Sequence, residues 1–275
     1  MTYSRRQLLA LAIPTDLTLL ADYTFGRTRP GATVRSMAQL AEVFRFRYIY
    51  DNARLDTLPS YWSRHRDYPD GDPRSLHVFT DDHLILKGRI PPGGGLRTGG
   101  LESGMLRALL PVSPGMRVEL RARLPRGLGV WPAFWLNPGV ETAGGSFSAL
   151  PWPPEIDIFE FFVWQGRTEP RILETNVHPV PGDAPVVRGG RTEPGYSFAD
   201  DFHVFALDWV RDRPIWLLDG RPIRQTAFRW NAPPAHILIT NQIGMNLDGV
   251  DLTGMPATEA NWDFTLDYLR IWRRA

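Results

Sequence analysis

The chain has 275 residues, of which 43% are hydrophobic, and carries a formal net charge of +1 with no cysteine. This length can bury one large core, whereas the small net charge, with arginines scattered among 30 acidic residues, gives no field that would attract nucleic acid. The lack of cysteine excludes disulfides, cysteine catalysis and cysteine–metal sites, and no apolar run is long enough to span a bilayer.

Residues 1–14 form an N-terminal segment that can be interpreted in two ways. Ser4–Leu9 (SRRQLL) resembles a twin-arginine export signal, and Ala10–Ala12 would suit a cleavage site between small residues. The apolar stretch Leu8–Ile13 is short for such a signal, so an ordinary N-terminal segment is the alternative. The fold is expected to begin directly afterwards, because Asp16–Phe25 has the pattern of a strand.

The rest of the chain predicts a series of short strands. Glycine and proline, 25 residues each, favour many turns over long helices. Ser36–Phe46 has helical spacing behind a serine cap, and we interpret it, with Leu58–Pro73, as an extended loop region on a sandwich. Further strands are predicted at Leu84–Leu86, Met116–Arg123, Val204–Val210 and Ile237–Asn241. The pattern indicates an all-β fold.

The most informative segment is Glu155–Glu160 (EIDIFE), which places three carboxylates in an apolar run. Burying several like charges on one strand is costly, so such a pattern is kept where the charges have a task. Paired carboxylates are the groups that hydrolyse glycosidic bonds. A solvated strand face with alternating acidic residues is the alternative interpretation of the six residues taken alone.

The spacing of these carboxylates predicts a β-bulge. Alternation puts Glu155 and Asp157 on one face, and Glu160 reaches that face only if one extra residue is inserted near Ile158 and Phe159. The two glutamates would then be roughly 13 Å apart at the backbone, and their side chains would have to lean together. A retaining glycosidase needs carboxyl groups about 5–5.5 Å apart.

The segments around this motif resemble glycoside hydrolase family 16, whose signature is Glu-x-Asp-x-x-Glu. Gly129–Leu136 (GVWPAFWL) is similar to the family's Gly-x-Trp-Pro-Ala-x-Trp strand. The other similar blocks, in the family's order, are Gly99–Pro125, Asp201–Trp209, Trp216–Gly220 and Phe264–Trp272. The resemblance covers about residues 17 to 275 and implies one catalytic domain over residues 15–275. The implied fold is a β-jelly-roll sandwich of two antiparallel sheets, with a cleft on the concave sheet.

The resemblance also implies a reaction, the hydrolysis of internal β-glycosidic linkages of a polysaccharide with retention. Glu155 would be the nucleophile and Glu160 the acid/base, with Asp157 adjusting their titration. The bulged motif is commoner among β-1,3-glucanases and galactan hydrolases of the family, so a β-1,3-glucan or related exopolysaccharide is the expected substrate. A transglycosylase and a non-catalytic glycan-binding module are the alternatives, although both glutamates are intact.

Several further residues are expected to contact the substrate. Trp131 and Trp135 are four apart on one strand, so they share a face, and sugar rings stack on indoles; Trp62 is a weaker candidate of the same kind. By the resemblance, His178 lies beside the acid/base, with Asn176 on the same face by alternation. Asn241, followed by Gln242, resembles a cleft-lining strand of the family. Core positions are the alternative for these tryptophans and for His178.

No cofactor is expected for catalysis. Some family members bind a structural calcium between the first strand and an aspartate of the last strand, which is Asp267 in this chain. One carboxylate is few for a calcium site, so calcium is not favoured. The expected partner is the polysaccharide alone, with no nucleic acid and no membrane span. We expect an exported monomer, periplasmic or extracellular, because the substrates are extracellular polymers; a cytoplasmic location is the alternative.

Overall fold

The structure, a computed structural model, describes residues 16–51, 65–66, 76–89, 101–127, 129–141, 147–149, 153–163, 169–180, 188–243 and 262–275. The N-terminal segment 1–14, Trp62 and most of Leu58–Pro73 lie outside these residues. None of the helices in the described ranges is long and apolar enough to cross a membrane.

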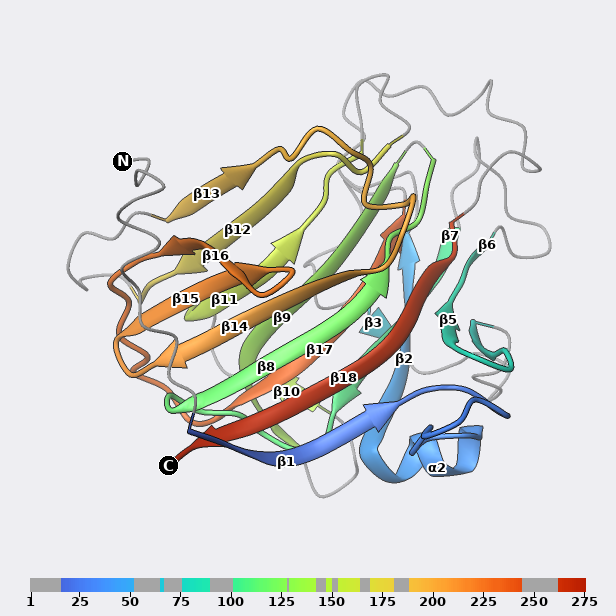
Figure 1. Ribbon diagram of the computed structural model, residues 1–275, viewed down its shortest axis with the longest axis horizontal. Helices are drawn as coiled ribbons and strands as arrows, with labels where there is room; N and C mark the ends of the chain where they lie inside the picture. Colours follow the sequence, from blue (N-terminus) through green and yellow to red (C-terminus); the bar gives the residue numbers. More distant parts are fainter. Residues whose placement is uncertain are drawn as a thin grey trace.

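The described residues form two antiparallel sheets that pack face to face, as the sequence predicts (Figure 1). The first, called the supporting sheet, contains in spatial order β16 (Arg221–Gln225), β15 (Arg213–Leu218), β14 (His203–Val210), β8 (Met116–Arg123), β18 (Phe264–Arg274), β5 (Leu84–Leu86) and β4 (His77–Phe79). The first strand, β1 (Leu17–Thr24), also pairs with β18.

The second sheet carries the Glu155–Glu160 strand and is called the carboxylate sheet. Its strands, in spatial order, are β13 (Gly189–Thr192), β12 (Leu173–His178), β11 (Glu155–Glu160), β9 (Val130–Glu141), β17 (Ala235–Ile243), β7 (Leu101–Ala108), β2 (Phe44–Asp51) and β3 (His65–Arg66). Two short strands extend it, because β10 (Phe147–Ala149) pairs with β9 and β6 (Gly88–Arg89) pairs with β7. The motif strand β11 therefore lies inside the sheet, between β12 and β9.

Aromatic side chains from both sheets meet in the core between them. Phe159 of β11 contacts Phe134 of the carboxylate sheet and Phe205 and Phe264 of the supporting sheet, with ring centroids 4.5–6.2 Å apart. All four rings are at most 1% exposed. Burying side chains of this size contributes about 1.5–3 kcal/mol each, so this cluster ties β11 firmly to the sheet behind it.

The expected loop region at Ser36–Phe46 is wrong in part. Ser36 does cap a helix, α2 (Met37–Val43), by accepting a hydrogen bond from the Gln39 backbone at 3.3 Å. From Phe44 onward, however, the chain is strand β2, which pairs along its whole length with β7. Since β2 and β7 are about 60 positions apart in sequence, the local pattern did not reveal this pairing.

Candidate active site

The predicted β-bulge is present in β11. The pairing of β11 with β12 shifts between Asp157 and Glu160, and its pairing with β9 shifts between Asp157 and Phe159. Ile158 and Phe159 are consecutive, and both side chains enter the core. Two successive inward residues return Glu160 to the outward face on which Asp157 lies, as the spacing predicted.

Glu160 is held by two hydrogen-bond donors from neighbouring strands. The Trp131 indole donates to Oε1 at 3.0 Å, and the Asn176 amide donates to Oε2 at 2.6 Å. Burial raises the pKa of Glu160, while the hydrogen bonds from Asn176 and Trp131 act in the opposite direction. The carboxyl group is thus fixed in position and takes up a proton more readily than an exposed glutamate.

Asp157 is 3% exposed and lies between the two glutamates in sequence. Burial, followed by the charge of Glu160, raises the pKa of Asp157 well above its usual range. Asp157 donates a hydrogen bond to Glu160, and its Oδ2 lies 3.1 Å from Nε2 of His178. With both pKa values raised, the Asp157–Glu160 pair holds a proton more readily than two exposed carboxyl groups would.

Glu155 stands at the start of β11, opposite His178 of β12. Its Oε1 is 3.5 Å from His178 Nε2, and its Oε2 accepts a hydrogen bond from the Asn137 amide at 3.4 Å. The Glu155 side chain is 14% exposed, so it is partly accessible from outside. A carboxylate that lies beside an amide and an imidazole and is partly exposed has surroundings that suit a nucleophile.

Two residues of the supporting sheet fix the bulge from behind. The indole of Trp216 donates to the backbone carbonyl of Asp157 at 2.8 Å. The Arg224 guanidinium stacks on that indole, with Cζ 4.3 Å from the ring centroid, and donates to the Thr175 carbonyl at 2.6 Å. Burial lowers the pKa of Arg224 to about 10, and its charge acts to lower the pKa of Asp157.

The structure brings most of the predicted site residues together. Glu155, Asp157, Glu160, Asn176, His178 and Trp131 are linked by the contacts given above. Trp135 lies on the same face of β9 as Trp131 but is 4% exposed and packs with Met105, Ala133 and Leu238. Its ring has almost no free surface for a sugar, so the stacking role is kept for Trp131, which is half-buried.

The expectation for Asn241 is wrong. Asn241 is fully buried, and its amide donates to the backbone carbonyls of Leu86 at 2.8 Å and Trp262 at 2.6 Å. It shares the inward face of β17 with Ile237 and Ile239, which are core residues. Its role is therefore structural.

Two further residues lie on the outward face: Asn137, which was not singled out from the sequence, and Gln242, which was named there only together with Asn241. Asn137 is two positions after Trp135, so alternation along β9 would have placed it beside the carboxylates. Gln242 lies opposite Trp131 in the pairing of β17 with β9, and its Nε2 has no hydrogen-bond partner within the described residues. Gln242 is 1% exposed, so like Trp135 it has almost no free surface for a sugar.

The described residues also include one group that could hold a metal ion. Ligand atoms of Glu155, Asp157 and His178 lie within 4.8 Å of one another. The hydrogen bonds described above already account for the positions of these side chains.

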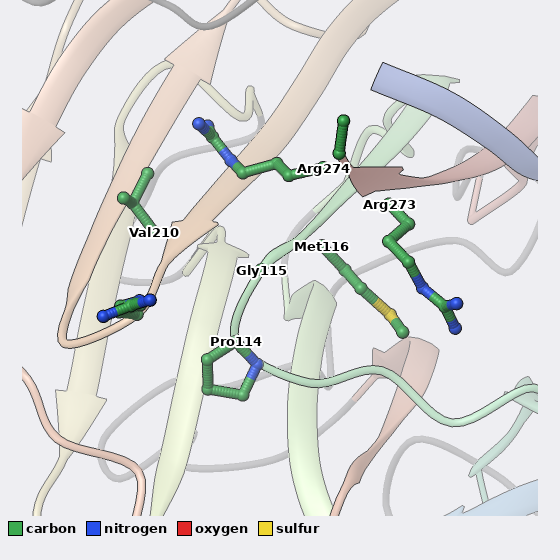
Figure 2. A pocket seen from close by; sticks show the side chains of 8 residues that line it. Pro114, Gly115, Met116, Val210, Arg273 and Arg274 are labelled. Carbon is green, nitrogen blue, oxygen red and sulfur yellow. The ribbon is translucent and has the colours of Figure 1, made fainter. Parts of the chain in front are cut away.

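A separate cavity lies on the supporting sheet. It has a volume of about 410 Å³ and is lined by Pro114, Gly115, Met116, Val210, Arg211, Arg273, Arg274 and Ala275 (Figure 2). Arg274 is paired with the buried Asp208 at 2.6 Å. These residues belong to the ends of β8, β14 and β18, so the cavity is not part of the carboxylate site.

A β-sandwich with two carboxyl groups on one face, one of them buried and inclined to hold a proton, defines a glycosidase-type site. The family described as "Glycosyl hydrolases family 16" matches residues 115–264, more than half of the chain. The protein belongs to this family.

Two curated relatives are similar to parts of the chain. The "Glucan endo-1,3-beta-glucosidase" of Cryptopygus antarcticus is 40% identical over 108 residues, which are 38% of this chain and 37% of that protein. The "Glucan endo-1,3-beta-glucosidase A1" of Niallia circulans is 30% identical over 177 residues, 57% of this chain and 24% of that protein. The matching part of this chain thus spans well under half the length of either relative.

The fold is also similar to that of a solved structure. The endo-beta-1,3-glucanase from Pyrococcus furiosus matches with a TM-score of 0.64 at 24% identity, covering 94% of this chain and 95% of that chain. This likeness confirms the jelly-roll fold.

Proposed function

We propose that the protein is a retaining endo-β-glucanase that hydrolyses β-1,3-linked glucan or a related exopolysaccharide. Membership of the glycosyl hydrolase family supports the reaction class, and the printed names of the two relatives support the linkage. The observation that carries the proposal is the bulge of β11, which places Glu155, Asp157 and Glu160 on one face with distinct surroundings.

Each carboxyl group has one role in the proposed reaction. Glu160 gives its proton to the glycosidic oxygen while Glu155 attacks the anomeric carbon from the other side and forms a covalent glycosyl-enzyme. Water then enters, Glu160 removes its proton, and the Glu155 ester is cleaved with net retention. Asp157 donates a hydrogen bond to Glu160 when Glu160 is charged. This bond stabilises the Glu160 carboxylate after it has given up its proton and before water enters.

Trp131 is the proposed sugar contact beside the acid/base. Trp131 orients Glu160 through its N–H, and its half-buried ring offers a face on which a sugar can stack. This double role would couple substrate position to the proton donor, because a sugar stacked on the indole lies next to the Glu160 carboxyl.

The activity is tested by incubating the purified protein with a panel of β-1,3-, mixed-linkage and β-1,4-glucans and galactans, followed by chromatography of the products. We expect oligosaccharides of several lengths from β-1,3-glucan, and loss of at least about 10³-fold in rate for Glu155→Gln and Glu160→Gln. Products longer than an oligosaccharide substrate would show transglycosylation. Binding without cleavage by the wild-type protein would contradict the proposal and favour a glycan-binding module.

We further propose that the enzyme acts outside the cytoplasm as a monomer. The support is chemical, since a long polysaccharide cannot enter the cell and endo-hydrolysis needs one carboxylate pair per chain. Fractionation of cells that produce the protein, and its elution volume in gel filtration, test these two statements.

A further inference from the structure

The buried carboxylate of Asp267, on β18, is held by two arginines. Arg29 pairs with Oδ1 and Arg121 with Oδ2, and the Asp267 side chain is 1% exposed. The same Nη1 atom of Arg29 lies 3.4 Å from the backbone carbonyl oxygen of Asp82 and 3.5 Å from that of Asp267. One positively charged nitrogen thus faces one carboxylate oxygen and two backbone carbonyl oxygens.

The backbone around Arg29 is fixed against the loop before β5. The Arg29 N–H donates to the Asp81 carbonyl at 3.0 Å, and the Arg27 N–H donates to the Thr80 carbonyl at 3.0 Å. Gly26 has a φ of +144°, and a Cβ there would lie 2.7 Å from the Asp81 carbonyl oxygen. The two loops therefore pack in direct contact, and this contact aims the Arg29 side chain at Asp267.

The oxygens that surround Arg29 Nη1 are those that a calcium ion would use. Calcium takes carboxylate and backbone carbonyl oxygens, and the family resemblance places a structural calcium of some members between the first strand and the position of Asp267. In this chain the residues do not fit that ion, because its single carboxylate already faces two guanidinium groups. The Arg29 guanidinium, which faces Oδ1 and both carbonyl oxygens, occupies the place of a divalent cation and would repel it.

The charge around the site is positive beyond this pair. The ring of the neighbouring His83 stacks on Phe202, with centroids 4.7 Å apart. Arg123 and Arg121 both stack on Phe202, at 5.4 and 4.8 Å from the ring centroid, which keeps them near.

We propose that the guanidinium of Arg29 replaces the structural calcium ion, so that this fold is stable without calcium, and that removing the Arg29 side chain creates a calcium site. The site would consist of the Asp267 carboxylate and the backbone carbonyls of Asp82 and Asp267, completed by water. This inference is independent of the proposed catalytic function.

Thermal unfolding of purified wild type, Arg29→Ala and Arg27→Ala tests the proposal, each in EDTA and in CaCl₂ or MgCl₂ up to about 10 mM. Arg27 is the matched control, because it lies in the same loop and pairs with an exposed Asp81. We expect the Tm of wild type and Arg27→Ala to be the same in EDTA and in calcium. Arg29→Ala should unfold about 5–10 °C lower in EDTA and recover at least half of this loss in calcium but not in magnesium.

Two results would overturn the proposal. One is a fall in the wild-type Tm in EDTA that calcium reverses, together with about one calcium per chain in elemental analysis. The other is a Tm of Arg29→Ala that is the same in EDTA and in calcium. If Arg29→Ala does not fold, Arg29→Lys provides the test, because lysine keeps the positive charge but has only one nitrogen. Arg29→Lys should fold with a Tm below that of the wild type, and this Tm should be the same in EDTA and in calcium. A Tm of Arg29→Lys that depends on calcium would contradict the proposal.

Discussion

At the scale of single residues, chemically identical side chains are made different by their neighbours. Glu160 and Glu155 are both half-buried, but Glu160 is held by an indole and an amide, whereas Glu155 lies beside His178 and Asn137. Desolvation raises the pKa of Glu160 and so favours the protonated form of this carboxyl group. We therefore expect the two carboxyl groups to take different roles, set by their different partners in the bulged strand.

Chemical rescue should separate these roles. Glu155→Ala leaves room for azide to attack directly, so rescue should yield a product of inverted configuration. Glu160→Ala should lose least with activated aryl glycosides, whose leaving group needs no proton, and azide should then give a retained product. The anomers are read by NMR. An inverted product from the rescue of Glu160→Ala would show that Glu160 is the nucleophile and Glu155 the acid/base.

The hydrogen bonds to Glu160 should control the pH dependence of kcat/KM. Both donors stabilise the charged carboxylate, so removing either raises the pKa of Glu160 and moves the basic limb of the profile to higher pH. Asn176→Ala should move it more than Trp131→Phe, because the Asn176 bond is shorter, 2.6 against 3.0 Å.

Trp230→Phe is the control for that experiment, because the Trp230 indole donates to the Pro233 carbonyl at 2.8 Å, in the segment between β16 and β17. Its profile should coincide with that of the wild type. A basic limb that moves to lower pH in Asn176→Ala would show that Glu160 is not the acid.

At the scale of the element, the decisive feature is the bulge of β11 and its attachment to the sheet behind it. Trp216 is 1% exposed and reaches through the core to the Asp157 carbonyl, so the supporting sheet helps to set the position of the carboxylates. The bulge is therefore fixed by a tertiary contact as well as by its own sequence.

Trp216→Phe should leave that carbonyl without its donor, at a cost of about 1–3 kcal/mol in the free energy of unfolding, and should lower kcat more than it changes KM. Trp209→Phe is a matched control: Trp209 is also 1% exposed, and its Nε1 has no hydrogen-bond partner among the described residues. Urea unfolding and steady-state kinetics compare the two. Equal effects of both substitutions on kcat would contradict the role of the Trp216 contact.

Much of this element could be predicted from the sequence, because Glu155, Asp157 and Glu160 can lie on one face of a strand only if the strand contains a bulge. Asn241 was misassigned because β17 is apolar on both faces, so alternation did not show which residues point inward. Trp135 is buried by Met105 and Leu238, which come from two other strands and are invisible to a local pattern. Arg29 and Asp267 are 238 positions apart, so their contact also required the fold.

At the scale of the whole molecule, the buried carboxyl group of Asp157 makes the free energy of unfolding depend on pH. The folded protein holds a proton on Asp157 more tightly than the unfolded chain does, because burial and Glu160 raise the pKa of Asp157. This contribution to stability is fully present below the pKa of an unfolded aspartate. It is lost as the pH rises through the higher pKa of the folded state.

Asp157→Asn removes this titration. The variant should therefore unfold a few degrees above the wild type near neutral pH, roughly 3 °C for each kcal/mol, and the difference should shrink as the pH falls toward 4. Differential scanning fluorimetry from pH 4 to 8 measures both proteins. A difference that is independent of pH, or that grows in acid, would show that Asp157 is charged in the folded protein.

The most direct test of the whole account is the configuration of the first product. Proton NMR of the wild-type protein acting on a β-1,3-glucan should show the β-anomer of the new reducing end first, with the α-anomer appearing only by mutarotation. That result is required if Glu155 forms a glycosyl ester and Glu160 serves as acid and then base. Initial formation of the α-anomer would contradict the account, because it would require water to attack in place of Glu155.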